Sequence, residues 1–439
     1  MPHSSIVHDL RSAHSADALL TGVPLPTLLY FALPIILGNI FQQLYSIVDA
    51  IVVGNFLGDL PLSGISVASP IVDVANALVI GGTIGVGVLC AHYCGAGEGE
   101  RLRCMNATAL LGGGALTLLI ALCGIFFSTP LLRAQGTEEA VCREAAVYLQ
   151  LVFAGLLFCF LYNYYAAMLR SCGNSRTPFL ILLLSSTLHA LLDVLFVGVF
   201  GWGIRGVAFS TVLCQALAAA ACILYAQRRC PPLLLRPANL RFDRQMARLV
   251  LSYAWAAALQ QAVVCIGRLL VQGMLTPLGT STVTGYNMSL RTEQFLFCFS
   301  QGISAAMVVC LSQNLGHGDR PRARRFFRIS VLVELALIAL LGTVCFLFPA
   351  RIVGLFSDNA DVIAAGAQYT GAMAYLYVFA YLGEVIQGFF RGLGRLRLTM
   401  VASLLQVLLR VVLSYLLIPV WGMYGICAAV VSGWVLLVG

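Results

Sequence analysis

A stripe of polar side chains interrupts an apolar stretch near the start of the chain. Residues 31–58 are long and apolar enough to cross a bilayer, which takes about 20 apolar residues. Four of the polar side chains within them are Asn39, Gln42, Ser46 and Asp49. Their three- and four-residue spacing places them on one face of a helix. An ionised carboxylate at the centre of a bilayer costs at least about 2.5 kcal/mol, so this face must turn toward protein or water. Asp49 is therefore the first candidate for proton or ion binding.

Asp193 is a second acid with a similar placement. Asp49 and Asp193 each lie about two helical turns from the same end of their predicted spans. Two carboxylates close together in a medium of low dielectric disfavour double ionisation, so one could bind a proton near neutral pH, or the pair could hold Na⁺. Asn163 and Thr211 are possible neutral ligands. The alternative is a structural hydrogen bond to a neighbouring side chain, for instance to His189 one turn earlier.

The composition indicates a polytopic membrane protein. The chain is 60% hydrophobic and 10% charged, whereas soluble proteins carry about 25% charged residues. All 26 basic residues are arginines, which excludes a Walker A lysine and a Schiff-base lysine. Because HExxH, GxSxG and paired-Asp motifs are also missing, we expect no enzymatic activity. The 15 cysteines include no CxxC pair, so we expect them to pack in the interior and to bind no metal.

Apolar segments separated by short polar loops predict twelve membrane-spanning helices. Arginine placement orients them: 19 of the 26 fall on the side of the N-terminus, four on the other side, and three lie within spans. By the positive-inside rule, we expect both termini to lie in the cytoplasm. We expect the protein itself to lie in the cytoplasmic membrane of the cell. The net charge of +8 therefore reflects topology, and we expect no nucleic-acid partner.

The two halves of the chain repeat each other. Residues 87–101 match residues 308–322 at an offset of 221, which aligns Gly95 with Gly316. Each half holds six predicted spans, so both halves have the same orientation, and transporters place their substrate at such an interface.

We therefore predict an all-α membrane protein with twelve transmembrane helices in two pseudo-symmetric six-helix lobes. The N-lobe is expected over 1–227, a cytoplasmic linker over 228–245 and the C-lobe over 246–439. The last predicted helix stops short of the position that its repeat partner reaches, so we expect it to be truncated.

Acids of the second half are further candidates. Glu293 and Glu384 lie within predicted spans, and Glu384 aligns with Asn163 in the repeat. Each could be a second proton or cation site, or simply the partner of an arginine within the spans. Those arginines are Arg268, Arg291 and Arg410. The residues expected to line a substrate cavity are Gln42, Gln43, Tyr162, Gln260 and Gln261.

Several stretches resemble the multidrug and toxic compound extrusion (MATE) transporters. FALPIILGN, FQQLYSIVD and VVGNFLG are similar to the first helix of that family, and LLDVLFVGVFGWGIRGVAFST and SQNLGHGD extend the resemblance over nearly the whole chain. The resemblance implies two six-helix lobes around a central cavity. It also implies efflux of organic, often cationic, amphiphiles in exchange for H⁺ or Na⁺.

The resemblance also assigns roles to residues of the first half. Family members use an Asp on the first helix, an Asp on the fifth and a Thr on the sixth, and Asp49, Asp193 and Thr211 match these. Where well-studied relatives have Asn, one turn before the fifth-helix Asp, this chain has His189. Because histidine can itself carry a proton, the coupling ion stays open.

These observations predict a secondary active antiporter in the cell membrane. It would export small organic, cationic amphiphilic compounds in multidrug efflux, as a monomer and without a cofactor beyond the coupling ion. The alternative is a flippase for a lipid-linked anionic glycan precursor, which a cavity lined mainly by arginines would favour.

Overall fold

The computed structural model describes residues 14–234, 242–274 and 280–439, and for a few positions in these ranges, Asp49 among them, it describes the backbone alone. Because a bilayer offers no water to backbone polar groups, helices that satisfy their own hydrogen bonds are expected, and the described chain is almost wholly helical. Its elements are α2 (His14–Thr21), α3 (Pro24–Phe56), α4 (Asp59–Ala96), α5 (Gly99–Ala134), α6 (Glu139–Ser171), α7 (Arg176–Asp193), η1 (Val194–Val199), α8 (Ile204–Arg229), η2 (Pro231–Leu233), α9 (Arg244–Gly273), α10 (Thr280–Gly316), α11 (Arg320–Leu347), α12 (Pro349–Val353), α13 (Ala360–Met373), α14 (Tyr377–Gly392), α15 (Leu396–Trp421) and α16 (Met423–Val438).

Ten helices of the described chain are long and apolar enough to cross a membrane. They are α3 to α11, with η1 continuing α7, and α15. The pair α13–α14, bent by 58°, gives an eleventh span, and the apolar helix α16 has 16 residues. In chain order these elements coincide with the twelve predicted spans. The prediction of an all-α membrane protein is confirmed.

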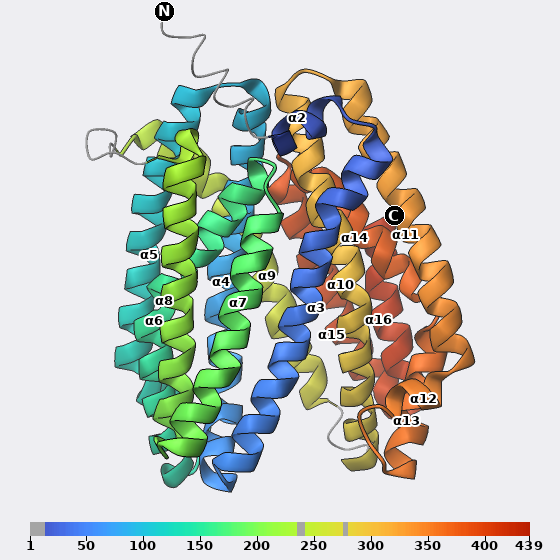
Figure 1. The fold of residues 1–439 in the computed structure, drawn as a ribbon. Coiled ribbons are helices and arrows are strands. Elements are labelled where there is room, and N and C mark those ends of the chain that lie inside the picture. Colours follow the sequence, from blue (N-terminus) through green and yellow to red (C-terminus); the bar gives the residue numbers. More distant parts are fainter. Residues whose placement is uncertain (1–13, 235–241, 275–279) are drawn as a thin grey trace, which may run out of the picture.

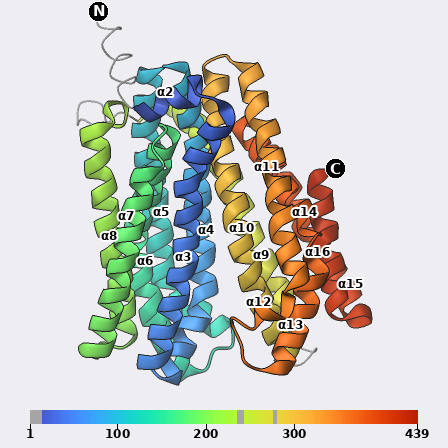
Figure 2. The same ribbon diagram turned by 45° about the vertical axis from the view of Figure 1, so that its right-hand side comes forward.

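The helices form two halves that meet along a few of their members. We call α3–α8 the N-terminal half and α9–α16 the C-terminal half; Figures 1 and 2 show them side by side. Across the interface α4 packs on α9 and α10, and α3 packs on α10. Within the predicted linker 228–245, α8 continues to Arg229 and α9 begins at Arg244, while 235–241 lie outside the described residues.

Contacts between the halves obey the repeat found in the sequence. A Cβ atom added to Gly81 on α4 would lie 2.6 Å from the carbonyl oxygen of Ala257 on α9. Gly302 on α10 likewise abuts Ile36 on α3, where an added Cβ would lie close to the side chain and, at 3.1 Å, to the backbone nitrogen. Adding 221 to positions 36 and 81 gives 257 and 302, so the two contacts are copies of each other. The pseudo-symmetry of the two halves is therefore present in their packing.

A second symmetric pair of contacts closes the interface at the end where the arginines gather. Gly95 on α4 lies directly against the backbone of Gln313 on α10, and Gly316 lies against the carbonyl oxygen of His92. Positions 92 and 95 become 313 and 316 at the same offset of 221. The Gln313 side chain also donates a hydrogen bond of 2.6 Å to the carbonyl oxygen of Ser171 at the end of α6. The halves are thus in backbone contact at this end.

Neighbouring glycines of α4 test whether the interface requires this close approach. Gly81→Ala should destabilise the protein by about 1–3 kcal/mol, because the new methyl group meets the α9 backbone. Gly82→Ala should be neutral or stabilising by up to about 1 kcal/mol, because a Cβ there meets no atom within 4 Å and alanine favours the helix. Thermal unfolding of the purified protein in detergent checks both. Equal effects at the two positions would contradict the packing described.

Candidate functional site

His189 and Asp193 form the centre of a polar cluster where α3, α7 and α8 meet. They lie one turn apart on α7, and their exposed fractions are 5% and 0%. His189 Nδ1 lies 2.8 Å from Asp193 Oδ2. His189 Nε2 lies 2.9 Å from Oγ1 of Thr211 on α8. The imidazole ring therefore stands between a carboxylate and a hydroxyl group.

Two more hydroxyl groups complete this arrangement. Ser210 on α8 donates a hydrogen bond to Oδ1 of Asp193. Tyr45 on α3 hydrogen-bonds to Nδ1 of His189, and its ring meets the imidazole edge-on, with centroids 5.0 Å apart. Tyr45, His189, Asp193, Ser210 and Thr211 are called the Asp193 cluster below. It joins three helices through one carboxylate–imidazole pair.

Local backbone structure sets the positions of these side chains. The α-helix α7 ends at Asp193 and passes into the π-helical turn η1, and such turns occur frequently at functional sites. On α8, the hydroxyl groups of Ser210 and Thr211 both lie 2.8 Å from the carbonyl oxygen of Val207, about one turn back. Trp202 stacks on Phe196 at a centroid distance of 4.9 Å and fastens the turn between the two helices.

The residues predicted for proton or ion coupling are placed as follows. Asp193, His189 and Thr211 come together. His189 lies in contact with Asp193, and which role the pair has, ion coupling or structural support, stays a prediction. Asp49 belongs to α3, but its side chain lies outside the described residues. The amide nitrogen of Asn163 donates a hydrogen bond of 2.9 Å to the carbonyl oxygen of Cys159, one turn back on α6, so this amide is engaged within its own helix.

Sequence reasoning missed Tyr45 and Ser210. Tyr45 lies one turn before Asp49 and next to Ser46 of the polar stripe, so the stripe could have included it. Ser210 directly precedes Thr211. Hydroxyl groups beside predicted ion-binding residues were the available signal, but adjacency alone does not tell which of two neighbours turns toward the acid.

The five residues predicted to line a substrate cavity differ in exposure. Those with exposed surface are Gln42, Gln43, Tyr162 and Gln261. Gln260 is buried and hydrogen-bonds to Gln387 on α14 and, at 3.1 Å, to Ser403 on α15. Its side chain joins three helices of the C-terminal half, so its place in the structure is that of a packing residue.

Glu384 of the C-terminal half is held in an ion pair. Its carboxylate pairs with Arg391, seven residues later on α14, and Arg391 also donates to Oγ of Ser304 on α10 at 3.2 Å. The partner is therefore none of the three arginines predicted for it.

The buried acids Glu293 and Glu334 differ in their surroundings. The Tyr369 hydroxyl donates to Oε2 of Glu293 at 3.4 Å, and Arg410 and Arg268 act on this carboxyl group electrostatically. Glu334 on α11 is fully buried, and neither of its carboxyl oxygens has a hydrogen-bond partner among the described residues. Among these acids, Glu334 is thus the one with neither an ion pair nor a hydrogen bond in the described chain.

Comparison with known proteins adds to this geometry. The model of the MatE family matches residues 34–195 and 256–416, once in each half and with starts 222 residues apart. The chain belongs to the MATE family.

Similarity to individual MATE proteins extends over most of the chain. It is 28% identical over 387 residues to the probable multidrug resistance protein YpnP of Bacillus subtilis, covering 88% of this chain and 86% of that protein. It is 26% identical over 346 residues to the FAD transporter of Shewanella oneidensis, covering 76% and 75%. A solved structure described as the outward-facing conformation of a multidrug resistance MATE family transporter superposes with a TM-score of 0.86 at 18% identity, covering 96% and 95%.

Family membership fixes the general class of activity. This MATE protein is a multi-pass membrane transporter of small organic compounds and not an enzyme. The first matched interval includes Asp49, His189 and Asp193, whereas Ser210 and Thr211 follow it. The Asp193 cluster thus combines residues from inside and outside the matched region.

Two isosteric substitutions separate the roles of the acids of this MATE transporter's C-terminal half. Glu384→Gln should cost about 1–3 kcal/mol, because it leaves the guanidinium of Arg391, 11% exposed, without its carboxylate. Glu334→Gln should cost less than about 1 kcal/mol, because no ion pair is broken. Unfolding in detergent measures both, and a larger loss for Glu334→Gln would contradict the pairing described.

Proposed function

We propose that this MATE transporter is a proton-coupled antiporter that exports organic amphiphiles across the cell membrane as a monomer. The observation that carries the proposal is the buried contact between His189 and Asp193, joined by hydroxyl groups to α3 and α8. A carboxylate and an imidazole in contact share a proton readily, and buried ionisable groups within membrane spans commonly mark proton pathways.

The chemistry of the cluster favours H⁺ over Na⁺ as the coupling ion. A hard cation prefers a shell of oxygen ligands, and Asp193, Thr211 and Tyr45 could supply some of them. However, the imidazole of His189 lies between Asp193 and Thr211 and contacts both, so it occupies the space that a bound Na⁺ would need. Where relatives have Asn, this space would hold an amide oxygen.

The arginines bear on the orientation of the protein in the membrane, and the contact between the halves bears on its conformational state. We propose that the arginine-rich end, where Gly95 meets Gln313, faces the cytoplasm and that both termini lie there. The halves contact each other at that end, so the described conformation would be closed to the cytoplasm and outward-facing.

The helix α3 is suited to transmit protonation to the interface between the halves. It carries Tyr45, which contacts His189, and also Ile36 and Asn39, which contact α10 of the other half. A proton can drive the transport cycle only if it binds the two states with different affinities. We propose that protonating the Asp193–His189 pair alters the bond to Tyr45 and thereby the packing of α3 on α10.

Charged side chains within spans bear on the substrate. Asp73 on α4, Arg268 on α9 and Arg291 on α10 are exposed although they lie within spans. Because charges do not face lipid, we propose that they face a water-filled space between the halves. Asp73 suits the cationic amphiphile inferred from the resemblance.

Arg268 and Arg291 favour a second candidate, a flat organic anion. One relative is named as an FAD transporter, and FAD is a flat aromatic anion. The relatives give no support to the lipid-linked glycan considered as the alternative.

Transport in proteoliposomes tests the coupling. A pH gradient without Na⁺ should drive export by the wild type and by Asp358→Asn, whose side chain is exposed outside the spans. The same gradient should drive transport at least about tenfold more slowly for Asp193→Asn, which cannot ionise, and for Asp49→Asn. A Na⁺ gradient at equal pH should have no effect on the wild type but should drive export by His189→Asn. Export by the wild type driven by Na⁺ alone would overturn proton coupling.

Transport of two probes of opposite charge tests the substrate class. The probes are ethidium, a cation, and FAD, an anion. If FAD is exported, Arg268→Gln and Arg291→Gln should each weaken its transport by at least about tenfold, because each removes a positive charge that attracts the anion. If ethidium is exported, Asp73→Asn should weaken its transport similarly, because it removes a negative charge that attracts the cation. Whichever probe the wild type exports identifies the class. If neither probe moved under a pH gradient that drives another dye, the charges named here would not line the substrate path.

A further inference from the structure

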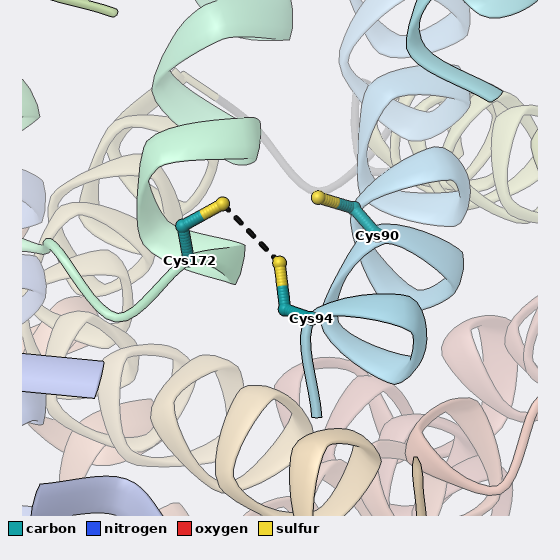
Figure 3. A group of neighbouring side chains, drawn as sticks. All are labelled: Cys90, Cys94 and Cys172. Atoms are coloured by element: carbon teal, nitrogen blue, oxygen red, sulfur yellow. Dashed lines mark hydrogen bonds between the residues drawn. The ribbon is translucent and has the colours of Figure 1, made fainter. Parts of the chain in front are cut away.

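Three cysteines that are distant in the sequence gather at the junction of α4 and α6. Cys90 and Cys94 lie one turn apart on α4, and Cys172 follows the last residue of α6. Their sulfur atoms all lie within 4.8 Å of one another, with 3.3 Å between those of Cys94 and Cys172. Figure 3 shows the three sulfur atoms pointing toward a common centre.

In the part of the chain that the structure describes, the surroundings of these thiols are largely apolar and supply no balancing cation. Cys90 is fully buried in the core of the N-terminal half, and Cys94 and Cys172 are half-buried, which leaves a route of entry. Among the described residues, the groups that interact electrostatically with the three thiols are other cysteines, Cys230 included, and Tyr164, none of which is a cation. A bound ion must therefore be soft, and its complex must be close to neutral, because an unpaired buried charge is costly.

Charge and coordination number together select the ion. Zn²⁺ on three thiolates would carry a charge of −1 and prefers a fourth ligand, and Cu⁺ on three thiolates would carry −2. A trivalent ion on three thiolates is neutral, and arsenic(III) and antimony(III) form three bonds to sulfur. We propose that Cys90, Cys94 and Cys172 form a binding site for a trivalent thiophilic metalloid, taken up as its neutral hydroxide.

The reaction balances without an oxidant or reductant. With arsenous acid, As(OH)₃, three S–H bonds and three As–O bonds break while three S–As bonds form. Each thiol proton leaves with a hydroxide as water, so three water molecules are released. The oxidation states of arsenic and sulfur do not change.

The site adjoins the contact that closes the two halves. Cys94 precedes Gly95, and Cys172 follows Ser171; both of these neighbours contact Gln313 of the C-terminal half. A bound metalloid would cross-link α4 to α6 next to this contact, and it would restrain Gly95 and Ser171, which contact Gln313. Occupancy would therefore favour the state in which the halves are closed at the arginine-rich end. Binding itself does not depend on the proposed transport mechanism.

Intact-protein mass spectrometry after incubation of the reduced protein with arsenite tests the site. One arsenic per chain should bind to the wild type and to the control Cys142→Ala/Cys214→Ala/Cys345→Ala, which removes three buried cysteines elsewhere. Binding should be lost in Cys90→Ala/Cys94→Ala/Cys172→Ala. Cys172→Ala alone should bind at least about tenfold more weakly, because two thiols remain.

X-ray absorption at the arsenic edge keeps the test decisive if the triple variant does not fold. The wild type should show three sulfur neighbours and no oxygen, and Cys172→Ala should show two sulfurs and one oxygen. Undiminished binding by the triple variant, no binding by the wild type, or tighter binding of Cd²⁺ or Cu⁺ than of arsenite would each overturn the proposal.

Discussion

An ionised carboxyl group inside a bilayer needs partners within the protein, and this constraint shapes the interior of both halves around Asp193 and Glu384. Asp193 meets it with an imidazole and a serine hydroxyl, and Glu384 meets it with a guanidinium. Through a further partner on a neighbouring helix, Ser210 or Ser304, each acid helps to fix how the helices sit against one another. The Asp193 cluster joins α3, α7 and α8, whereas the pair of Glu384 and Arg391 joins α14 to α10 through Ser304.

The two halves illustrate what a repeat does and does not transmit. Backbone contacts at the interface are copied, as the pairs Gly81–Ala257 and Ile36–Gly302 show. The polar interiors are not: the position of Asn163 in the first half holds Glu384 in the second, and the ion pair there has no copy around Asn163. Both halves need small residues where helices approach one another closely, so these packing contacts are alike in the two halves. Polar partners can diverge, because each half satisfies its own buried groups separately.

Much of the fold could be predicted from the sequence, because its signals are local. Long apolar runs, arginine placement and the 221-residue offset gave twelve spans and two halves. Periodicity also predicted a polar face on the first span, and the depth of Asp193 in its span marked it as a candidate. The contact partner of each polar residue could not be predicted. Helical periodicity tells on which face of its helix a residue lies, but not which other helix packs against that face. For that reason Tyr45 was missed, Gln260 was assigned to a cavity, and Glu384 was given the wrong arginine. Cys90, Cys94 and Cys172 seemed scattered for the same reason.

The helix α3 connects the constraint on buried acids with the closure of the halves. Its residue Tyr45 contacts the Asp193 cluster, and about two turns earlier Ile36 and Asn39 contact α10. Close packing leaves little room for continuous deformation, so a change at one contact of a rigid helix shifts the other. The polar stripe on α3 therefore does more than keep charge away from lipid. It lies on the helix that contacts both the Asp193 cluster and the C-terminal half, and the proposed proton coupling would act through this double contact.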